Sequence, residues 1–248
     1  MKLLENKNAL ITGCRRGIGR ATLERFAAQG ANVWAHVRAV TREFEVTASE
    51  LAKKCGVQIR PIGFDLADHE AIKSGVKEIH SHKIPIDILV NNAGIVPESR
   101  LFLMTPIEQI RRVTEINYLS QILLTQLVSR SMVRQKRGSI IFLSSIAGLD
   151  GDPAQTEYSA SKGAINAAVK KLAREFAPFG VRVNAVAPGL IDTDMGGAMS
   201  EELREQTVGS TLLKRPGKPE EVADAILFLA SGMSSFMTGQ ILRVDGGR

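Results

Sequence analysis

Short apolar runs alternate with longer amphipathic stretches along the whole chain. The apolar runs are rich in β-branched residues and predict strands at residues 8–12, 31–37, 57–62, 86–90, 138–144, 181–187 and 241–245. The stretches between them carry apolar residues at helical spacing, as in Leu23, Phe26 and Ala27. Nearly continuous apolar strands are typical of a parallel sheet that is buried on both faces. The pattern predicts an α/β chain with a doubly wound parallel sheet of about seven strands and helices on both faces.

No linker, low-complexity segment or change of composition divides the 248 residues, so we expect a single domain over 1–248. One long stretch, at about 190–217, has no predicted strand and contains Met195, Gly196 and Gly197. We interpret it as a helical substrate lid in which the glycines permit movement. An ordinary helical insertion is the alternative.

Composition narrows the class of protein. Hydrophobic residues at 44% and charged residues at 23% are ordinary for a globular chain. No apolar run approaches the roughly 20 residues of a membrane helix, and the N-terminal stretch lacks the zones of a signal peptide. We therefore expect a cytoplasmic protein without a membrane segment. Cys14 and Cys55 have no paired spacing, which favours reduced thiols.

The net charge of +6 raises the question of an acidic partner. The basic residues form only short runs at 134–137 and 170–171, and aromatic residues make up 5% of the chain. Without a recognisable reading module, these values do not favour nucleic acid. His80 and His82 have no partner at ligand spacing, so we expect surface histidines and no metal site.

A glycine-rich turn, TGCRRGIG, lies between the first predicted strand and the first predicted helix. Gly13, Gly17 and Gly19 allow a sharp turn, a close approach of the backbone to a pyrophosphate, and tight packing of helix on sheet. The N–H groups of the helix N-terminus favour the same anion. Strand, turn and helix in this order predict a dinucleotide-binding Rossmann fold.

Over nearly its whole length the chain resembles the short-chain dehydrogenase/reductase family. The motifs that carry the resemblance are TGxxxGIG at 12–19, NNAG at 91–94, a helix asparagine at 117, a serine at 145, YxxxK at 158–162, PGxxxT at 188–193 and VDGG at 244–247. The resemblance implies an oxidoreductase that transfers hydride between a nicotinamide cofactor and a carbonyl or alcohol.

The resemblance assigns the catalytic roles to Asn117, Ser145, Tyr158 and Lys162. Reduction of a ketone leaves an alkoxide that needs a proton, and a tyrosine with a free pKa near 10 needs help to release one. Tyr158 and Lys162 are four residues apart and share a helix face, so the ammonium group stabilises the phenolate. Ser145 would hold the carbonyl oxygen, and Asn117 a water of the proton relay.

The choice of cofactor follows from charge at the second strand. Val37 stands where an NAD-type family member carries an aspartate; Arg38 follows it, and Arg16 precedes the second glycine. Arginine accommodates the 2′-phosphate of NADP, so we expect NADPH/NADP+. Arg15 either adds a contact or is solvated. Asp65 resembles the residue that binds the adenine amino group, and its alternative role is to cap the next helix.

The resemblance implies a larger set of cofactor-binding residues, in which Asn91 alternatively supports the sheet centre and Thr193 meets the nicotinamide amide. The set is Gly13, Arg15, Arg16, Gly17, Ile18, Gly19, Arg38, Asp65, Leu66, Asn91, Ala93, Gly94, Tyr158, Lys162, Pro188, Gly189, Ile191 and Thr193.

Within the family the chain looks most like the 3-oxoacyl-[acyl-carrier-protein] reductases, which implies a thioester ketone on an acidic carrier protein. Lys136 and Arg137 fit one basic position near the site entrance, whereas Phe179 replaces a second expected arginine. Acidic residues at 150, 152 and 157 would disfavour an anionic carrier by a modest, screened amount. A free small ketone, an alcohol or a sugar-derived carbonyl stays open as the substrate, as does a non-catalytic NADP-binding sensor.

The family resemblance also implies a homotetramer assembled through the fifth and sixth helices and the C-terminal strand. Small residues on the helix after Tyr158 would let a neighbouring helix approach closely; they are Ala160, Gly163, Ala164, Ala167 and Ala168. The same residues suit packing against the chain's own sheet.

Overall fold

A seven-stranded parallel sheet forms the centre of the protein in the computed structural model, which describes residues 2–193 and 201–248. The strands are β1 (Asn8–Thr12), β2 (Asn32–Val37), β3 (Ile59–Gly63), β4 (Ile88–Asn91), β5 (Gly138–Leu143), β6 (Val181–Pro188) and β7 (Ile241–Val244). Their order is β3-β2-β1-β4-β5-β6-β7, and every neighbouring pair is parallel. This confirms the predicted doubly wound Rossmann fold, and each predicted strand is present to within a few residues.

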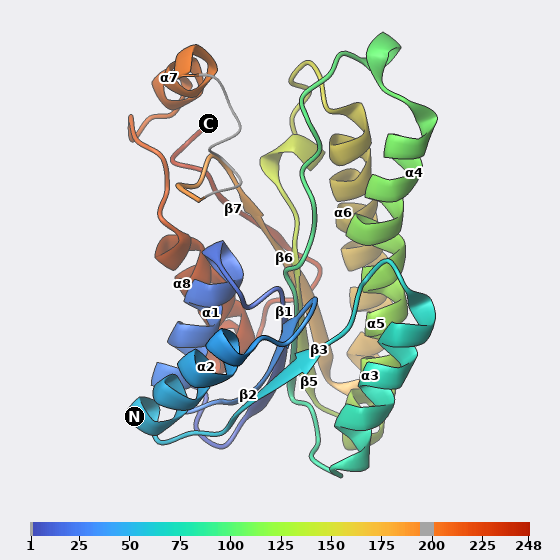
Figure 1. Ribbon diagram of the computed structural model, residues 1–248, viewed down its shortest axis with the longest axis vertical. Coiled ribbons are helices and arrows are strands. Elements are labelled where there is room, and N and C mark those ends of the chain that lie inside the picture. The colour runs from blue at the N-terminus through green and yellow to red at the C-terminus, as the bar shows by residue number, and fades with distance from the viewer. Residues whose placement is uncertain (1, 194–200) are drawn as a thin grey trace.

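Helices cover both faces of the sheet (Figure 1). Within the described residues the α-helices are α1 (Gly17–Ala28), α2 (Arg42–Cys55), α3 (His69–Ser81), α4 (Ile107–Thr114), α5 (Ser120–Gln135), α6 (Thr156–Phe176), α7 (Glu201–Ser210) and α8 (Pro219–Ala230). Short helices are η1 (Phe102–Met104), the π-helical turn η2 (Glu115–Leu119), η3 (Ile146–Gly148), η4 (Ala177–Phe179) and η6 (Gly232–Ser234). In Figure 1, α1, α2 and α8 lie on one side of the sheet and α3 to α6 on the other.

An apolar core lies between the sheet and the helices on each of its two faces, because successive residues of a strand point to opposite faces. Ile11 of β1 packs in the core beneath α1 and α8, with Phe26 and Ile226. The preceding residue, Leu10, packs in the other core, with Leu124 of α5. Both cores consist of residues that are almost fully buried, so they anchor the strand ends from which the site is built.

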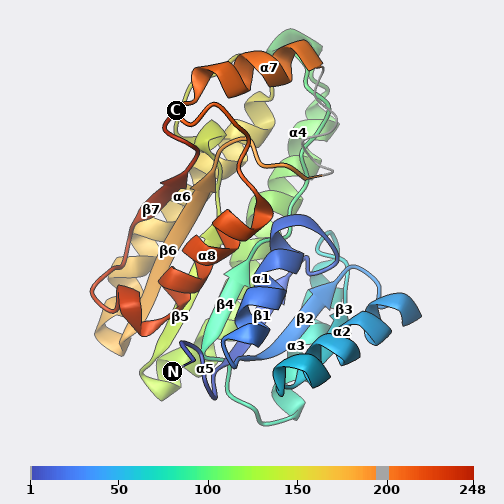
Figure 2. The ribbon, with the colours of Figure 1, turned by 90° about the vertical axis from the view of Figure 1, so that its left-hand side faces the viewer.

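Strand order reverses direction between β1 and β4, so the crossovers leave β1 toward one edge of the sheet and β4 toward the other. In open α/β sheets, ligands bind in the crevice beyond the carboxyl ends of the strands at such a point. Figure 2 shows α7 and the C-terminus at one end of the molecule and the N-terminus at the opposite end.

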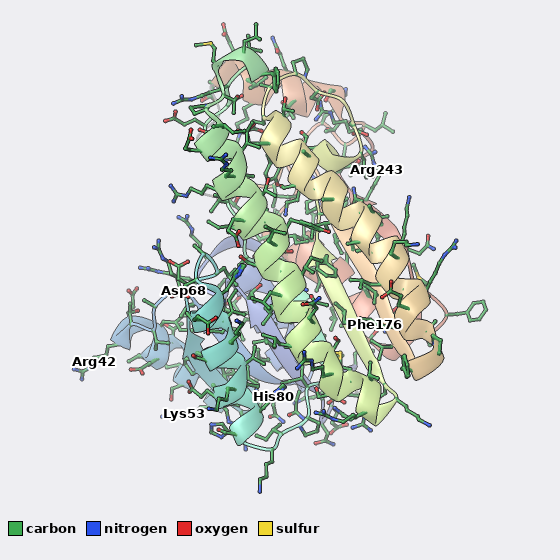
Figure 3. All side chains as sticks on the ribbon, turned by 90° about the vertical axis from the view of Figure 1, so that its right-hand side faces the viewer. Arg42, Lys53, Asp68, His80, Phe176 and Arg243 are labelled. Atoms are coloured by element: carbon green, nitrogen blue, oxygen red, sulfur yellow. The ribbon has the colours of Figure 1, made fainter. Side chains whose placement is uncertain are left out.

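Asp68 caps α3, because its Oδ1 atom accepts hydrogen bonds from the backbone N–H groups of Glu70 and Ala71 at 2.9 and 3.1 Å. The cap therefore does not require Asp65. Figure 3 shows Asp68 and His80 at opposite ends of α3.

His82 is exposed, as expected, whereas His80 is only partly exposed. His80 is half-buried, and burial together with the nearby charge of Arg134 lowers its pKa. His82 is exposed and places its ring edge-on to Trp34, with ring centroids 5.0 Å apart. In the described part of the chain, no three His, Cys, Asp or Glu side chains gather into a metal-binding group. No helix there is long and apolar enough to cross a membrane.

Candidate active site

The glycine turn after β1 is held by backbone hydrogen bonds to β2. The N–H groups of Gly13 and Cys14 both donate to the carbonyl of His36, at 3.0 and 2.9 Å. Gly13 and Gly17 have φ angles of +78° and +56°, where a Cβ atom is unfavourable. A Cβ atom on Gly19 would lie 2.1 Å from the Gly13 carbonyl oxygen, so only glycine permits this turn.

Thr12 and Asn92 lock the turn to the end of β4. The Thr12 hydroxyl accepts from the backbone N–H groups of Asn92 and Ala93, at 2.9 and 3.0 Å. The Asn92 side chain donates to the Thr12 carbonyl at 2.8 Å. Sequence reasoning did not assign Asn92 or His36, although the second asparagine of NNAG was a usable signal.

His36 of β2, which supports the glycine turn, is a neutral residue. Its Nε2 atom lies 2.9 Å from the carbonyl of Phe64, and its ring is buried. Burial lowers the pKa of His36 to about 4, so the imidazole carries no charge at neutral pH.

The turn and the start of α1 fit the pyrophosphate of a dinucleotide. Helix α1 begins at Gly17, and its N-cap residue, Arg16, makes no side-chain capping hydrogen bond. Thr193 lies over the turn, with its Cγ2 atom 3.4 Å from where a Gly17 Cβ would be. A glycine cradle at an uncapped helix N-terminus provides backbone N–H groups and a positive dipole end for a phosphate.

Arg38 and Asp65 form an ion pair at the end of the second and third strands. The Arg38 Nε atom lies 2.8 Å from Asp65 Oδ2, and the Arg38 side chain is 81% exposed. Asp65 also accepts from the backbone N–H of Ala67 at 2.9 Å. Arg15 and Arg16 are exposed on the neighbouring glycine turn.

Ser145, Tyr158 and Lys162 come together at the end of β5 and the start of α6. The Ser145 side chain hydrogen-bonds to Tyr158, and the Lys162 Nζ atom lies 5.6 Å from the centroid of the Tyr158 ring. Nζ donates to the Leu143 carbonyl at 2.7 Å. Burial raises the pKa of Tyr158, whereas the Ser145 hydrogen bond opposes that rise. Burial lowers the pKa of Lys162 to about 8.

Asn117 lies in the π-helical turn η2 and clamps the segment after β4. Its Oδ1 atom accepts from the Ile95 N–H at 2.8 Å, and its Nδ2 atom donates to the Ile95 carbonyl at 2.9 Å. A Cβ atom on Gly94 would lie 3.0 Å from Asn117 Oδ1 and 3.9 Å from Lys162 Nζ. π-Helical turns inside longer helices are frequent at functional sites. Asn117 and Lys162 therefore share one buried corner of the site.

Close packing fixes Ser145 relative to α6. A Cβ atom on Gly148 would lie 2.6 Å from the Lys162 carbonyl carbon, so η3 rests directly on the helix backbone. The Asn166 side chain accepts from Ser144 at 2.6 Å and donates to the Gly148 carbonyl at 3.0 Å. The serine and the tyrosine are thus held by one rigid contact between η3 and α6.

Comparison with known proteins identifies the family. The family model described as enoyl-(acyl carrier protein) reductase matches residues 13–248. The 3-oxoacyl-[acyl-carrier-protein] reductase of Aquifex aeolicus is 40% identical over 244 residues, 98% of both chains. A short-chain type dehydrogenase/reductase from Mycobacterium marinum is 35% identical, with a TM-score of 0.89 over 98% of this chain and 95% of that one. The chain belongs to the short-chain dehydrogenase/reductase family.

A further neighbour is the crystal structure of a 3-oxoacyl-[acyl-carrier protein] reductase with bound NAD from Brucella melitensis. It is 35% identical, with a TM-score of 0.90 over 99% of this chain and 92% of that one.

In this member of the family, the Asn91 side chain faces helix α5. Asn91 is buried and donates to Thr125 of α5 at 3.0 Å, so its side chain supports the centre of the sheet, the alternative role considered for it. The neighbouring carbonyl of Ala93 is held by Gln121 at 2.8 Å. Gln121 is a support that the sequence did not single out.

The remaining predicted cofactor residues lie after β3, at and after the end of β6, and in α1. Leu66 is buried, and its carbonyl accepts from the Ser120 hydroxyl. Pro188 ends β6, and the N–H of Gly189 donates to the Val244 carbonyl at 3.0 Å. Ile191 forms an isolated parallel β-bridge with Gly217. Ile18 packs against the core beneath α1.

Part of the predicted lid at about 190–217 lies outside the described residues, including Met195, Gly196 and Gly197. The described part contains α7, and the Arg204 side chain of that helix pairs with Asp192 at 3.0 Å.

Lys136 and Arg137 do not lie at the entrance of their own chain's site, which corrects the prediction. They directly precede β5, whereas Ser145 follows it, and the six residues of that strand span about 20 Å. Arg137 pairs there with Asp87 at 3.2 Å, before the start of β4. Phe179 lies before β6, at this same end of the sheet.

The three acidic residues around Tyr158, whose charges were expected to disfavour an anionic carrier, all have partners within the chain. Asp150 pairs with Arg243 at 2.8 Å, and Asp152 pairs with Arg248 at 2.6 Å. Glu157 is buried and accepts from Gln109 at 2.7 Å. Residues far away in the sequence supply these partners, so the sequence pattern around Tyr158 could not indicate them.

Proposed function

We propose that this chain is an NADPH-dependent reductase that converts a 3-oxoacyl thioester on acyl carrier protein to the 3-hydroxyacyl form. The observation that carries the proposal is the group Ser145, Tyr158 and Lys162, which lies beside a glycine cradle suited to a dinucleotide. The relative that is 40% identical over 98% of both chains bears the name of that activity.

NADPH, when bound, supplies the hydride for the carbonyl carbon. Tyr158 supplies the proton: burial raises its pKa, so at neutral pH the hydroxyl retains the proton that the developing alkoxide requires. The Ser145 hydroxyl adds a second donor for the same oxygen. Once the proton has left, the nearby Lys162 ammonium stabilises the phenolate. Because the pKa of Lys162 is about 8, most of its population is charged at neutral pH.

Two named activities have to be separated, because the matching family model is described as an enoyl reductase and the curated relative as a 3-oxoacyl reductase. Absorbance of NADPH is followed with acetoacetyl and crotonyl thioesters, each on acyl carrier protein and on a small thiol. We expect oxidation of NADPH with acetoacetyl carrier. Turnover with the crotonyl thioester alone would overturn the proposal, and turnover only with free ketones would remove the carrier from it.

The Tyr158→Phe variant separates an enzyme from an NADP-binding sensor. Removing the hydroxyl deletes the proton donor while leaving the ring, so we expect loss of turnover and an NADPH dissociation constant within about twofold of wild type. A wild-type protein that binds NADPH tightly but reduces no member of a ketone panel would favour the sensor.

NADP selectivity rests on Arg38 and Arg16, with Val37 in place of an acidic residue. The Arg38–Asp65 pair is largely exposed, and such pairs contribute about 0–1 kcal/mol, so it does not prevent Arg38 from meeting a 2′-phosphate. The neighbouring structure named with bound NAD makes a direct measurement necessary. We expect Arg38→Asp to weaken NADPH binding at least tenfold relative to NADH. An unchanged ratio of the two dissociation constants would refute this assignment.

The homotetramer and the cytoplasmic location belong to the same proposal. Ala160 and Ala167 of α6 are exposed in the single chain, and Gly163 and Ala164 are partly exposed, which supports a close helix–helix contact. Light scattering after size-exclusion chromatography tests this, and a monomer at micromolar concentration would contradict the assembly.

A further inference from the structure

The loop at 149–155 joins the Ser145 segment to α6 and is held by two arginines from the end of the chain. Arg243 of β7 binds Asp150 with its two terminal guanidinium nitrogens, Nη1 and Nη2, at 2.9 and 2.8 Å. Arg248 pairs with Asp152 at 2.6 Å. A two-point arginine–carboxylate pair restricts orientation as well as distance.

Arg243 is itself held in place. Its Nε atom pairs with Asp245 at 2.7 Å, and its Nη2 atom donates to the backbone carbonyl of Arg248 at 2.9 Å. The Asp245 side chain is only 8% exposed, and those of Arg243 and Asp150 are about one-third exposed. The hydrogen bond from Arg243 lowers the pKa of Asp150, so the pair stays charged at neutral pH. Figure 3 shows Arg243 toward the end of the molecule at which α6 begins.

The gripped loop leads directly to the catalytic serine. The backbone N–H of Asp150 donates to the carbonyl of Ile146 at 2.8 Å. Ile146 follows Ser145, whose hydroxyl oxygen accepts from the Ala147 N–H at 3.2 Å. One side-chain pair and one backbone hydrogen bond therefore connect Arg243 to the residue beside Ser145.

The other end of the loop contains strained backbone just before Tyr158. Ala154 and Gln155 have φ angles of +70° and +52°, which are uncommon for residues that carry a Cβ atom. The N–H of Gln155 donates to the Arg100 carbonyl at 3.2 Å. Strain of this kind persists only when the surroundings hold it, and it concentrates at functional sites.

The same C-terminal segment contacts the chain that follows α7. The N–H groups of Leu212 and Leu213 donate to the carbonyls of Gly247 and Gly246, at 3.3 and 3.1 Å. The segment 243–248 therefore contacts both the loop at 149–155 and the end of the predicted lid region.

We propose that Arg243 and Arg248 are positioning residues for the reductase. They fix the loop at 149–155 against the segment after α7, and the loop in turn fixes the positions of Ser145 and Tyr158. This inference rests on the proposed function. It concerns residues that touch neither the cofactor cradle nor the Tyr158 hydroxyl, so their loss alters the geometry of the catalytic pair and leaves cofactor binding intact.

The test compares Arg243→Leu and Asp150→Asn with a matched control, Arg25→Leu. Arg25 pairs with Asp224 at 2.9 Å between α1 and α8, so its loss removes a similar pair away from the loop. We expect a fall in kcat of about ten- to a hundredfold for both loop variants, because small misplacements of catalytic groups cost this much. The dissociation constant of NADPH stays within about twofold. We expect the double variant Arg243→Leu/Asp150→Asn to have a kcat no lower than that of either single variant.

Hydrogen exchange of each free protein is the second measurement. We expect faster exchange in peptides covering 146–157 and 211–213 in Arg243→Leu, unchanged exchange in α1, and no change in either loop peptide in Arg25→Leu. A kcat within twofold of wild type, or unchanged exchange at 146–157, would overturn the proposal. If Arg243→Leu does not fold, Asp150→Asn provides both readouts. If wild type reduces no ketone, the proposed function fails, while the exchange data still decide whether the arginines hold the loop.

Discussion

Replacing Lys162 by methionine tests whether the active-site ammonium group is held at a cost to folding. Lys162 is 3% exposed, and burial lowers its pKa from 10.5 to about 8. At about 1.4 kcal/mol per pH unit, this shift corresponds to about 3 kcal/mol. Methionine has a similar length and no charge, so it removes the free-energy cost of burying the ammonium group.

The sign of the effect follows from proton binding. Between pH 8 and pH 10.5 the unfolded chain holds the lysine proton and the folded chain has released it, so the unfolding free energy of wild type rises with pH. Below pH 8 both states are protonated and the full cost applies. Methionine removes the titration, whereas the carbonyl of Leu143 loses its donor at every pH, at a cost of about 1–3 kcal/mol.

The assay is urea unfolding of the cofactor-free wild type and Lys162→Met at pH 7 and pH 10. We expect the unfolding free energy of wild type, relative to the variant, to increase by about 2–3 kcal/mol between these pH values. The loss at Leu143 cancels in this comparison because it does not depend on pH. Lys171→Met, an exposed lysine on the same helix, is the control. A pH-independent difference between wild type and Lys162→Met would refute the reasoning.

Three further predictions follow from single contacts. Burial lowers the pKa of His36 to about 4. When the pH is lowered from 6.5 to 4, the unfolding free energy of wild type should therefore fall by up to about 3 kcal/mol relative to that of His36→Gln. Parallel pH profiles for the two proteins would contradict this prediction. Gly148→Ala brings a Cβ atom to 2.6 Å from the Lys162 backbone, so it should lower the unfolding free energy by about 1–3 kcal/mol and also lower kcat. Alanine should be tolerated at Gly163, where the nearest atom is 3.8 Å away. Equal melting temperatures of the two variants would argue against the contact at Gly148. Ala154→Gly relieves a left-handed residue and should raise the unfolding free energy by about 1 kcal/mol in urea unfolding, and a loss of stability would exclude strain at this position.

Local pattern was sufficient for the strands and the glycine turn. β1, with Leu10 facing one helix layer and Ile11 the other, has the continuous apolar sequence that a doubly covered parallel strand requires. Gly13 and Gly19 are needed because the backbone itself comes too close for a side chain, and that constraint acts on residue type at fixed spacing. Tyr158 and Lys162 share a face because a separation of four residues is slightly more than one helical turn.

Contacts between distant segments were beyond the reach of that pattern. The sequence could not show that Asp150 pairs with Arg243, because the two residues are 93 positions apart. Lys136 looked like an entrance residue, yet it precedes β5, whereas the site follows that strand. The orientation of the Asn91 side chain toward Thr125 depends on how α5 packs on the sheet.

The amino-acid sequence alone determined the strand succession and the glycine turn, because periodicity and glycine spacing are local properties. The candidate catalytic residues came from the resemblance to the family's motifs. Only the tertiary structure decided which charges pair with one another, which way the Asn91 side chain faces, and how burial shifts the pKa values of His36, Tyr158 and Lys162. Those outcomes depend on desolvation and on pairs of groups that meet only after the sheet and its two helix layers have assembled.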